Sequence, residues 1–143
     1  VDTLDAQLVG GLFTWDDDAA FFHREIDIEL SRWGLAQNDN AQFVVQPWQD
    51  PANIRRFELG ALAPTTQVFS WRAGAVDFSS FEGSQWPPVN GQEPLYSWRF
   101  DGAAVPPPGD EKVRINLWLL EGKAPANGTG GELVVEAFKF LAD

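Results

Sequence analysis

Three acidic side chains at alternate positions of one short stretch have the spacing needed for acid–base chemistry. Glu25, Asp27 and Glu29 alternate with three aliphatic residues. A period of two is typical of a β-strand with one buried face, so the three carboxyl groups should form a row on the other face. Crowded carboxyls oppose one another's ionisation, and cleavage of glycosidic bonds uses a carboxylate beside a protonated carboxyl. A solvated face of an acidic protein explains the same row, and alternation alone favours that simpler interpretation.

The residues on either side of this row bear on its chemistry. His23 is the only histidine and should share the carboxylate face of a strand predicted over about 22–31. Its imidazole could tune the acids, bind a sugar hydroxyl, or simply be satisfied at the strand end. Arg24 alternates onto the apolar side, so it should reach past the strand end or pair with an acid.

We expect no metal and no cofactor. A zinc site would need further His or Cys ligands, and the chain has one His and no Cys. Residues 16–18 are three consecutive aspartates, but they lack the alternating ligand spacing of a calcium loop. We therefore interpret 16–18 as a solvated turn.

Composition narrows the choice of partner. The chain has 143 residues and a net charge of −11, with ten basic residues. Nucleic acids and anionic membranes require a basic surface, so neither is expected as a partner. There is also no apolar run of membrane-spanning length. Seven Trp and eleven Phe suit both the core of a β-sandwich and the binding of sugar rings.

The elements that must position the acidic row are short strands. We predict one all-β domain over 1–143, an antiparallel β-sandwich or jelly roll, because no stretch has a helical period and turn signals separate the apolar runs. Ala73-Gly74 should be the tip of a hairpin. The nine predicted strands span 7–15, 22–31, 41–48, 54–59, 66–72, 75–81, 95–100, 113–120 and 132–140.

The Glu-x-Asp-x-Glu row resembles the active-site strand of glycoside hydrolase family 16, which includes laminarinases, lichenases and agarases. Asn116-Leu117-Trp118 matches a second motif of that family. Gln46 and Trp48 occupy a strand where the family has Gln or Asn and an aromatic residue. The order of motifs is similar from about residue 8 to the end. Two departures are a lack of the family's N-terminal strands and a histidine, His23, where relatives often have an aromatic residue.

The resemblance implies a concanavalin A-like sandwich with a concave sugar cleft, in a secreted or periplasmic protein. It implies a retaining, endo-acting hydrolase of a β-glucan or galactan, with Glu25 as nucleophile, Glu29 as acid/base and Asp27 tuning Glu25. The implied substrate-binding residues are His23, Gln46, Trp48, Asn116 and Trp118. Alternation places Asn116 and Trp118 on one face of their strand, and we expect this to be the carboxylate face, with Trp118 partly exposed.

Two alternatives to the enzyme remain open: a non-catalytic carbohydrate-binding sandwich of the same ancestry, and a structural domain with an acidic face. Positions i and i+4 of a flat strand lie ~13 Å apart, whereas a retaining pair of carboxyls needs ~5–5.5 Å, so the sheet must curve. A sandwich without its first strands leaves an edge or an apolar face open. We therefore expect either a homodimer that completes the sandwich or a smaller, closed barrel-like form.

Overall fold

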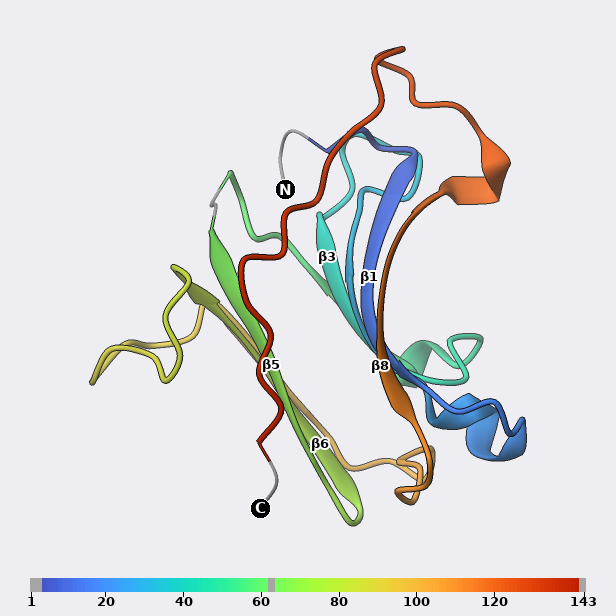
Figure 1. The fold of residues 1–143 in the computed structure, drawn as a ribbon, viewed down its shortest axis with the longest axis vertical. Coiled ribbons are helices and arrows are strands. Elements are labelled where there is room, and N and C mark those ends of the chain that lie inside the picture. The colour runs from blue at the N-terminus through green and yellow to red at the C-terminus, as the bar shows by residue number, and fades with distance from the viewer. Residues whose placement is uncertain (1–3, 62–63, 142–143) are drawn as a thin grey trace.

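A computed structural model describes residues 4–61 and 64–141 of the chain. It contains two antiparallel sheets in two layers (Figure 1), as predicted for a β-sandwich. The five-stranded sheet has the order β4-β3-β2-β1-β8, and the three-stranded sheet the order β5-β6-β7. The strands are β1 (Leu8–Trp15), β2 (Ile26–Leu30), β3 (Ala41–Val45), β4 (Ile54–Phe57), β5 (Thr65–Arg72), β6 (Ala75–Glu82), β7 (Tyr96–Phe100) and β8 (Lys112–Leu119). Short 3-10 turns are η1 (Ala20–Arg24), η2 (Pro51–Asn53) and η3 (Leu120–Gly122).

The core lies between the small sheet and one half of the large sheet. Ile26, Ile28 and Leu30 of β2 point into it and are almost fully buried. Phe43 of β3 stacks against Phe78 of β6, with ring centroids 4.7 Å apart. Because the aliphatic residues of β2 face this core, the intervening acidic residues must project from the outer face of the large sheet.

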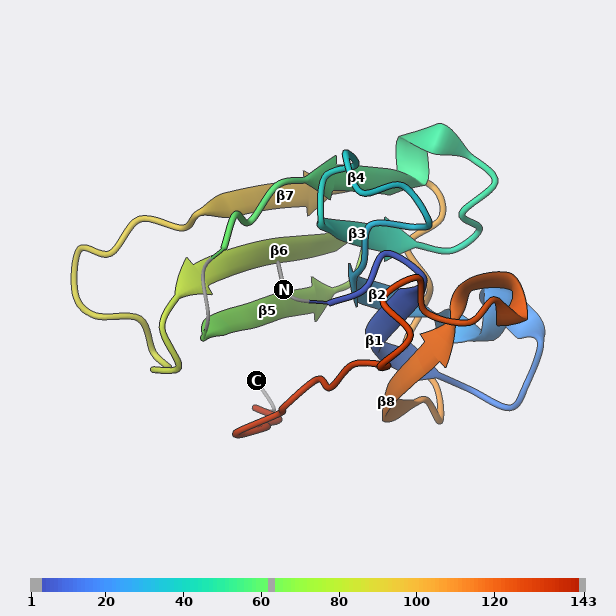
Figure 2. The same ribbon diagram turned by 90° about the horizontal axis from the view of Figure 1, so that it is seen from above.

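The other half of the large sheet is not covered by the small sheet. Val113, Ile115, Leu117 and Leu119 of β8 share the core-facing side through their pairing with β1, yet each is 38–49% exposed. Three strands cannot span the width of five, so β8 extends beyond the small sheet. Figure 2 shows this open side, bordered by the edge strands β5 and β8. The predicted closed barrel is therefore not present, since the two sheets remain separate.

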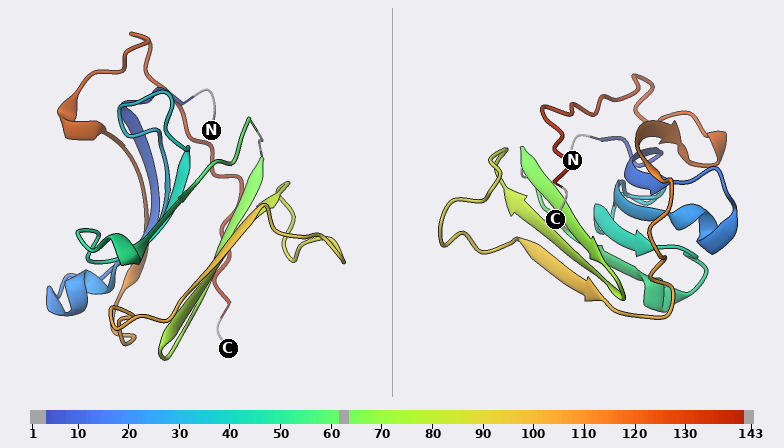
Figure 3. Two further views of the ribbon diagram at one scale, coloured as in Figure 1. Left: turned by 180° about the vertical axis from the view of Figure 1, so that it is seen from behind. Right: turned by 60° about the horizontal axis from the view of Figure 1, so that its bottom comes forward.

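The C-terminal segment crosses this open side without joining either sheet. Residues 131–141 form no strand, so the predicted strand over 132–140 is wrong. The alternating and apolar residues there suit a strand, but none of them forms a ladder with a partner. Leu133 packs over Gly10, and the residues that follow are exposed. Figure 3 shows this segment as an irregular trace that belongs to neither sheet. A Cβ at position 10 would lie 2.7 Å from Leu133 Cδ2, so the absence of a side chain at Gly10 makes room for Leu133.

The remaining predicted strands are present, with shifted ends. The hairpin at Ala73-Gly74 is confirmed by the direct pairing of β5 with β6, and Gly74 provides the positive φ of the turn. The predicted carboxylate strand over 22–31 begins only at Ile26, because a turn replaces its first residues. The strand predicted over 41–48 ends at Val45, so Gln46 and Trp48 lie just beyond it.

Candidate functional site

The register of the large sheet gathers the predicted residues on its outer face. Asp27 lies between Phe13 of β1 and Val44 of β3, and Glu29 lies between Gly11 and Gln42. Cross-strand partners in register point to the same side of a sheet. Glu25, directly before β2, accepts a backbone hydrogen bond from the Gln46 amide at 3.2 Å and continues the row. The outer face therefore carries all three carboxyl groups, which we call the carboxylate row.

Asp27 is the most enclosed member of the carboxylate row. It is 4% exposed, and it accepts a hydrogen bond from Gln46 Nε2 at 3.1 Å. Burial raises the pKa of Asp27 well above its ordinary value, and the charges of Glu25 and Glu29 raise it further. The raised pKa favours a protonated Asp27, whose carboxyl then donates the hydrogen bond that it shares with Glu25.

The pKa of Glu25 is raised overall, but two neighbours oppose this shift and favour its ionised form. Partial burial raises the pKa of Glu25, while the hydrogen bond from Asp27 and the charge of His23 lower it. The His23 ring stacks on Trp15 with centroids 3.9 Å apart and planes at 9°. His23 Nδ1 also lies 2.9 Å from the carbonyl oxygen of Asp16. This placement, before β2 and against Trp15, differs from the predicted position on the strand, but it leaves the imidazole within electrostatic reach of Glu25.

Glu29 is held by a chain of polar contacts from the next two strands. Gln42 is 6% exposed, and its Nε2 donates to Glu29 Oε2. Arg56 of β4 donates to Gln42 Oε1 at 2.7 Å, and its guanidinium lies 3.8 Å above the Trp33 ring. Burial raises the pKa of Glu29, with a smaller opposing effect from the Gln42 bond. A proton is therefore retained by Glu29 to higher pH than by an ordinary glutamate.

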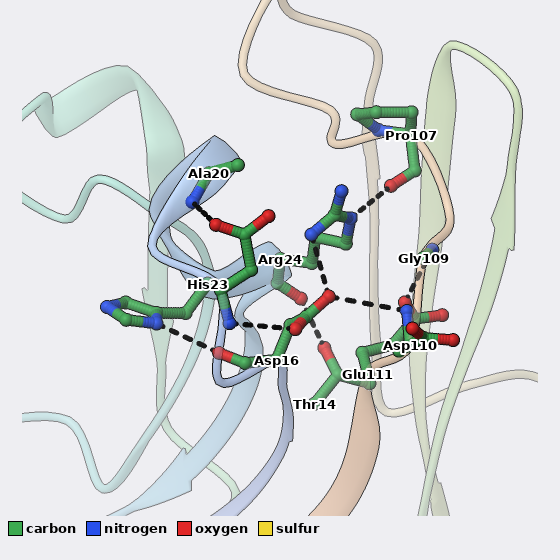
Figure 4. A network of polar contacts seen from close by, with 10 residues as sticks. Thr14, Asp16, Ala20, His23, Arg24, Pro107, Gly109, Asp110 and Glu111 are labelled. Carbon is green, nitrogen blue, oxygen red and sulfur yellow. Dashed lines mark hydrogen bonds and ion pairs between the residues drawn. The ribbon is translucent and has the colours of Figure 1, made fainter.

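A left-handed turn leads into the carboxylate row. Phe21, Phe22, His23 and Arg24 all have φ between 51° and 61°. Left-handed backbone costs non-glycine residues roughly 1–2 kcal/mol each, so surrounding contacts must hold this turn. Figure 4 shows those contacts, which centre on Asp16.

Asp16 ties this turn to β1 and to a distant connector. Its Oδ2 accepts from Arg24 Nη1 at 2.7 Å and from the Asp110 amide at 3.3 Å. Arg24 Nε also donates to the Pro107 carbonyl at 3.2 Å. The predicted pairing of Arg24 with an acid is thus confirmed. The prediction that 16–18 is a solvated turn is wrong for Asp16, because it is 7% exposed, although Asp17 and Asp18 are exposed.

The edge strand β8 brings the second motif to the same face. Asn116 pairs with Gly11, which itself pairs with Glu29, and Trp118 pairs with Val9. Trp118 is 40% exposed, as expected for a side chain on this face of an edge strand. A Cβ at position 11 would lie 2.5 Å from Asn116 Oδ1. Gly11 therefore makes room for the Asn116 amide to lean across β1 toward the row.

Two of the predicted substrate-binding residues have other contacts. Gln46 donates to Asp27, and its Oε1 accepts from the Trp48 amide at 2.8 Å. Gln46 thus holds Asp27 in place, and its amide is engaged within the protein. Trp48 is 60% exposed beyond the end of β3.

A shallow recess of about 300 Å³ adjoins the row. Phe13, Trp15 and Arg114 line it, and the register places Phe13 beside Asp27. A larger recess of about 650 Å³ is lined by residues of the 82–92 loop and by none of the carboxylate row. Chemistry at the row would thus take place on an open face, with the smaller recess at its side.

Sequence reasoning missed the residues that surround the row from neighbouring strands. Gln42, Arg56, Phe13 and Arg114 reach the outer face only because of the register of four separate strands. Within its own strand, the alternation of inward and outward residues places each of them on the outward side. That signal becomes informative only when the order of the strands is known.

Comparison with known proteins adds nothing to the geometry: no family model, no curated protein and no solved structure matches the chain. Within 4–61 and 64–141, no group of three or more His, Cys, Asp or Glu side chains is arranged to hold a metal ion. In the same residues, no helix combines the length and apolar character needed to cross a bilayer.

Proposed function

We propose that this protein is a retaining, endo-acting glycoside hydrolase that cleaves a β-linked polysaccharide such as a β-glucan or galactan. The observation that carries the proposal is the geometry of the carboxylate row, in which buried Asp27 lies on the same face as Glu25 and Glu29 and interacts with both. A retaining mechanism needs one ionised and one protonated carboxyl at the same pH. The different surroundings of Glu25 and Glu29 in the row supply a physical reason why one would be ionised while the other keeps its proton.

Glu25 is the proposed nucleophile. The bond from Asp27 favours its ionised form, which must attack the anomeric carbon to form a glycosyl-enzyme intermediate. Asp27 would act as a positioning residue that keeps its own proton and orients the Glu25 oxygens. Gln46 supports this role, because its side-chain amide donates a hydrogen bond to the Asp27 carboxyl.

Glu29 is the proposed acid/base. Its raised pKa favours the protonated form, which would give its proton to the leaving glycosidic oxygen. In the second step the Glu29 carboxylate would take a proton from the water that releases the sugar from Glu25. The contact with Gln42 would hold the carboxyl through both steps.

The open outer face supports endo action. The row lies in the middle of a five-stranded sheet, and only a shallow recess adjoins it. A chain of sugars can extend across such a face in both directions. Asn116 and the partly exposed Trp118 lie on the same face and offer an amide and an aromatic surface to a sugar beyond the Glu29 end.

The test is release of reducing sugars from barley β-glucan, laminarin, agarose, carrageenan and xylan, with Glu25→Gln as control. We expect release from at least one polysaccharide, none with the variant, and products that first appear with the substrate's anomeric configuration by proton NMR. Inverted products would contradict the assignment of Glu25 as nucleophile. Binding of a polysaccharide without release would instead support a non-catalytic carbohydrate-binding sandwich.

A further inference from the structure

Strand β8 places two cationic side chains on the outer face, beside the carboxylate row. Lys112 pairs with Trp15, and Arg114 pairs with Phe13. Both side chains are exposed. Within the described residues, neither side chain forms an ion pair or a hydrogen bond, whereas Arg24, Arg56 and Arg99 are engaged by other side chains.

Cations left without an acid are notable in this chain. It has 21 acidic and only ten basic residues, so acidic partners are abundant. Two neighbouring cations next to three carboxyl groups therefore require a reason. Exposed basic residues are often merely solvated, but Arg114 lines a recess together with Phe13 and Trp15, and Lys112 pairs with Trp15.

The register orders these groups in two parallel rows. One row runs Arg114, Phe13, Asp27 across β8, β1 and β2. The neighbouring row places Lys112 beside Trp15, and continuation of the register leads to Glu25. Each row therefore runs from a cation through an aromatic ring to a carboxyl.

The spacing of these rows suits a charged sugar. Adjacent strands lie ~4.8 Å apart, so a cation on β8 and a carboxyl on β2 are separated by ~10 Å at the backbone. A pyranose ring can lie on the aromatic side chains between them. An anionic substituent on that ring would then point toward β8, where Arg114 can bind it with two parallel hydrogen bonds.

We propose that Phe13, Trp15, Lys112 and Arg114 form a subsite for an anionic sugar residue, so that the substrate is a sulfated or carboxylated polysaccharide. Sulfate and carboxylate present the same chemistry to a guanidinium, because each has negatively charged oxygens that accept two parallel hydrogen bonds. The proposal rests on the proposed function only for the position of the glycosidic bond. Binding of the anionic sugar does not require its cleavage.

The net charge of the protein makes this proposal easy to test. At −11 the chain repels polyanions overall, so non-specific adsorption of an anionic polysaccharide is disfavoured. Any preference for anionic over neutral sugars must then come from local cations. Because these cations are exposed, the preference should also weaken as salt is added.

The experiment is titration calorimetry in a Glu25→Gln background, which prevents turnover. The probes are hexasaccharides from agarose, carrageenan and β-linked polymannuronate, which are neutral, sulfated and carboxylated respectively. We expect one anionic probe to bind more tightly than the neutral one. Arg114→Gln should then weaken binding of that probe about tenfold or more, because hydrogen bonds to charged groups carry most of the preference. The same substitution should leave the affinity for the neutral probe unchanged.

Arg99→Gln is the matched control. It removes the same charge, but Arg99 lies on the outer side of the small sheet and pairs with Asp77 at 2.8 Å. We expect it to leave all three affinities unchanged. If Arg99→Gln lowers the affinity for the anionic probe as much as Arg114→Gln does, only the net charge of the protein matters and the subsite is refuted.

The remaining outcomes separate this inference from the proposed function. Tighter binding of the neutral probe, or equal losses for neutral and anionic probes, would overturn the anionic subsite even if the wild-type protein cleaves agarose. Arg114-dependent binding of an anionic probe, together with no release of reducing sugars from any polysaccharide of the panel, would support the subsite and overturn the hydrolase. Failure of all three probes to bind would overturn the subsite.

Discussion

The two halves of the large sheet differ sharply on the same side. Ile28 on β2 is 3% exposed, because the small sheet covers that half. Ile115 on β8 points to the same side two strands away and is 49% exposed. Identical side chains on one sheet therefore contribute to a core in one place and to a surface in the other.

This difference matches a division of chemistry on the outer face. The carboxylate row stands on β2, in the covered half, where packing beneath it fixes the backbone. Asn116, Trp118 and the two cations stand on β8, in the uncovered half. Proton transfer needs exact placement of groups, whereas contacts with sugars tolerate adjustment. The comparison teaches that covered strands suit the former and an edge strand the latter.

The strongest test of the covered half concerns the two glutamates. Glu25→Gln should reduce hydrolysis by ~10⁴-fold or more on every substrate, as loss of a nucleophile does. Glu29→Gln should cost ~10²–10⁴-fold on polysaccharide, the usual contribution of a general acid, and much less on aryl glycosides whose leaving group needs no proton. Both are measured as kcat/KM on one activated and one unactivated substrate. Equal, small losses for both variants would show that the row is only a solvated face.

The comparison of the halves is tested directly by two matched truncations. Ile28→Ala should lower the free energy of unfolding by about 2–5 kcal/mol, because it leaves a cavity in the core. Ile115→Ala should cost about 0.5 kcal/mol or less, as a surface substitution does. Urea denaturation of both variants measures this. Similar losses would indicate that β8 is covered in solution, by a second copy of the chain or by the C-terminal segment.

Asp27 links the row to stability through pH. Its pKa is raised in the folded protein, so the folded state binds more protons than the unfolded state above about pH 4. The free energy of unfolding should therefore fall as pH rises from about 4 toward the folded pKa. Asp27→Asn removes this contribution, so it should stabilise the protein at pH 7 relative to wild type, by about 1.4 kcal/mol for each unit of raised pKa.

Thermal unfolding of wild type and Asp27→Asn from pH 4 to 8 provides the measurement. The difference in Tm should grow with pH and then level off. A constant difference across this range would mean that Asp27 ionises normally in the folded protein. Asp27→Asn should also shift the limbs of the rate profile more than it changes affinity for sugar.

The smallest effect is expected from the uncovered half. Trp118→Ala should weaken binding of oligosaccharide by about 1 kcal/mol, a typical value for one aromatic contact. The Tm should hardly change, because Trp118 is 40% exposed. Affinity electrophoresis measures the binding, and Trp48→Ala, beyond the end of β3, gives a second exposed tryptophan for comparison. A large fall in Tm for Trp118→Ala would place Trp118 in the structural part of the sheet.

Local patterns predicted the faces of strands but not their partners. The alternation at 25–30 was sufficient to place three aliphatic residues inside and the acids outside, since a core selects one parity. The hairpin at Ala73-Gly74 was equally local. Gln42 and Arg56 hold Glu29 in place. Their positions beside Glu29 depend on the pairing of three strands, which no single stretch of sequence encodes.

Two failures have the same physical cause. Residues 132–140 have the composition of a strand, but a strand also needs a neighbour with free hydrogen-bonding groups in reach. Phe22 and His23 continue the alternation of apolar and polar residues that is typical of a strand. However, the contact between Asp16 and Arg24 holds this stretch in a left-handed turn. In the first place a pairing partner is missing, and in the second place contacts outside the stretch hold another conformation. In both, the local preference for a strand does not decide the structure.

The contact between Arg24 and Pro107 also bears on the order in which the protein folds. It joins residues that are 83 apart in the chain, and the bond from Asp110 to Asp16 spans 94. Pairing of β1 with β2 spans far fewer residues and closes a short loop, so its entropic cost is low and it should come early. The turn before Glu25 can complete its contacts only after the connector at 107–110 has arrived. The carboxylate row would then be among the last parts of the molecule to mature, and a nascent chain would carry a sheet before it carries a site.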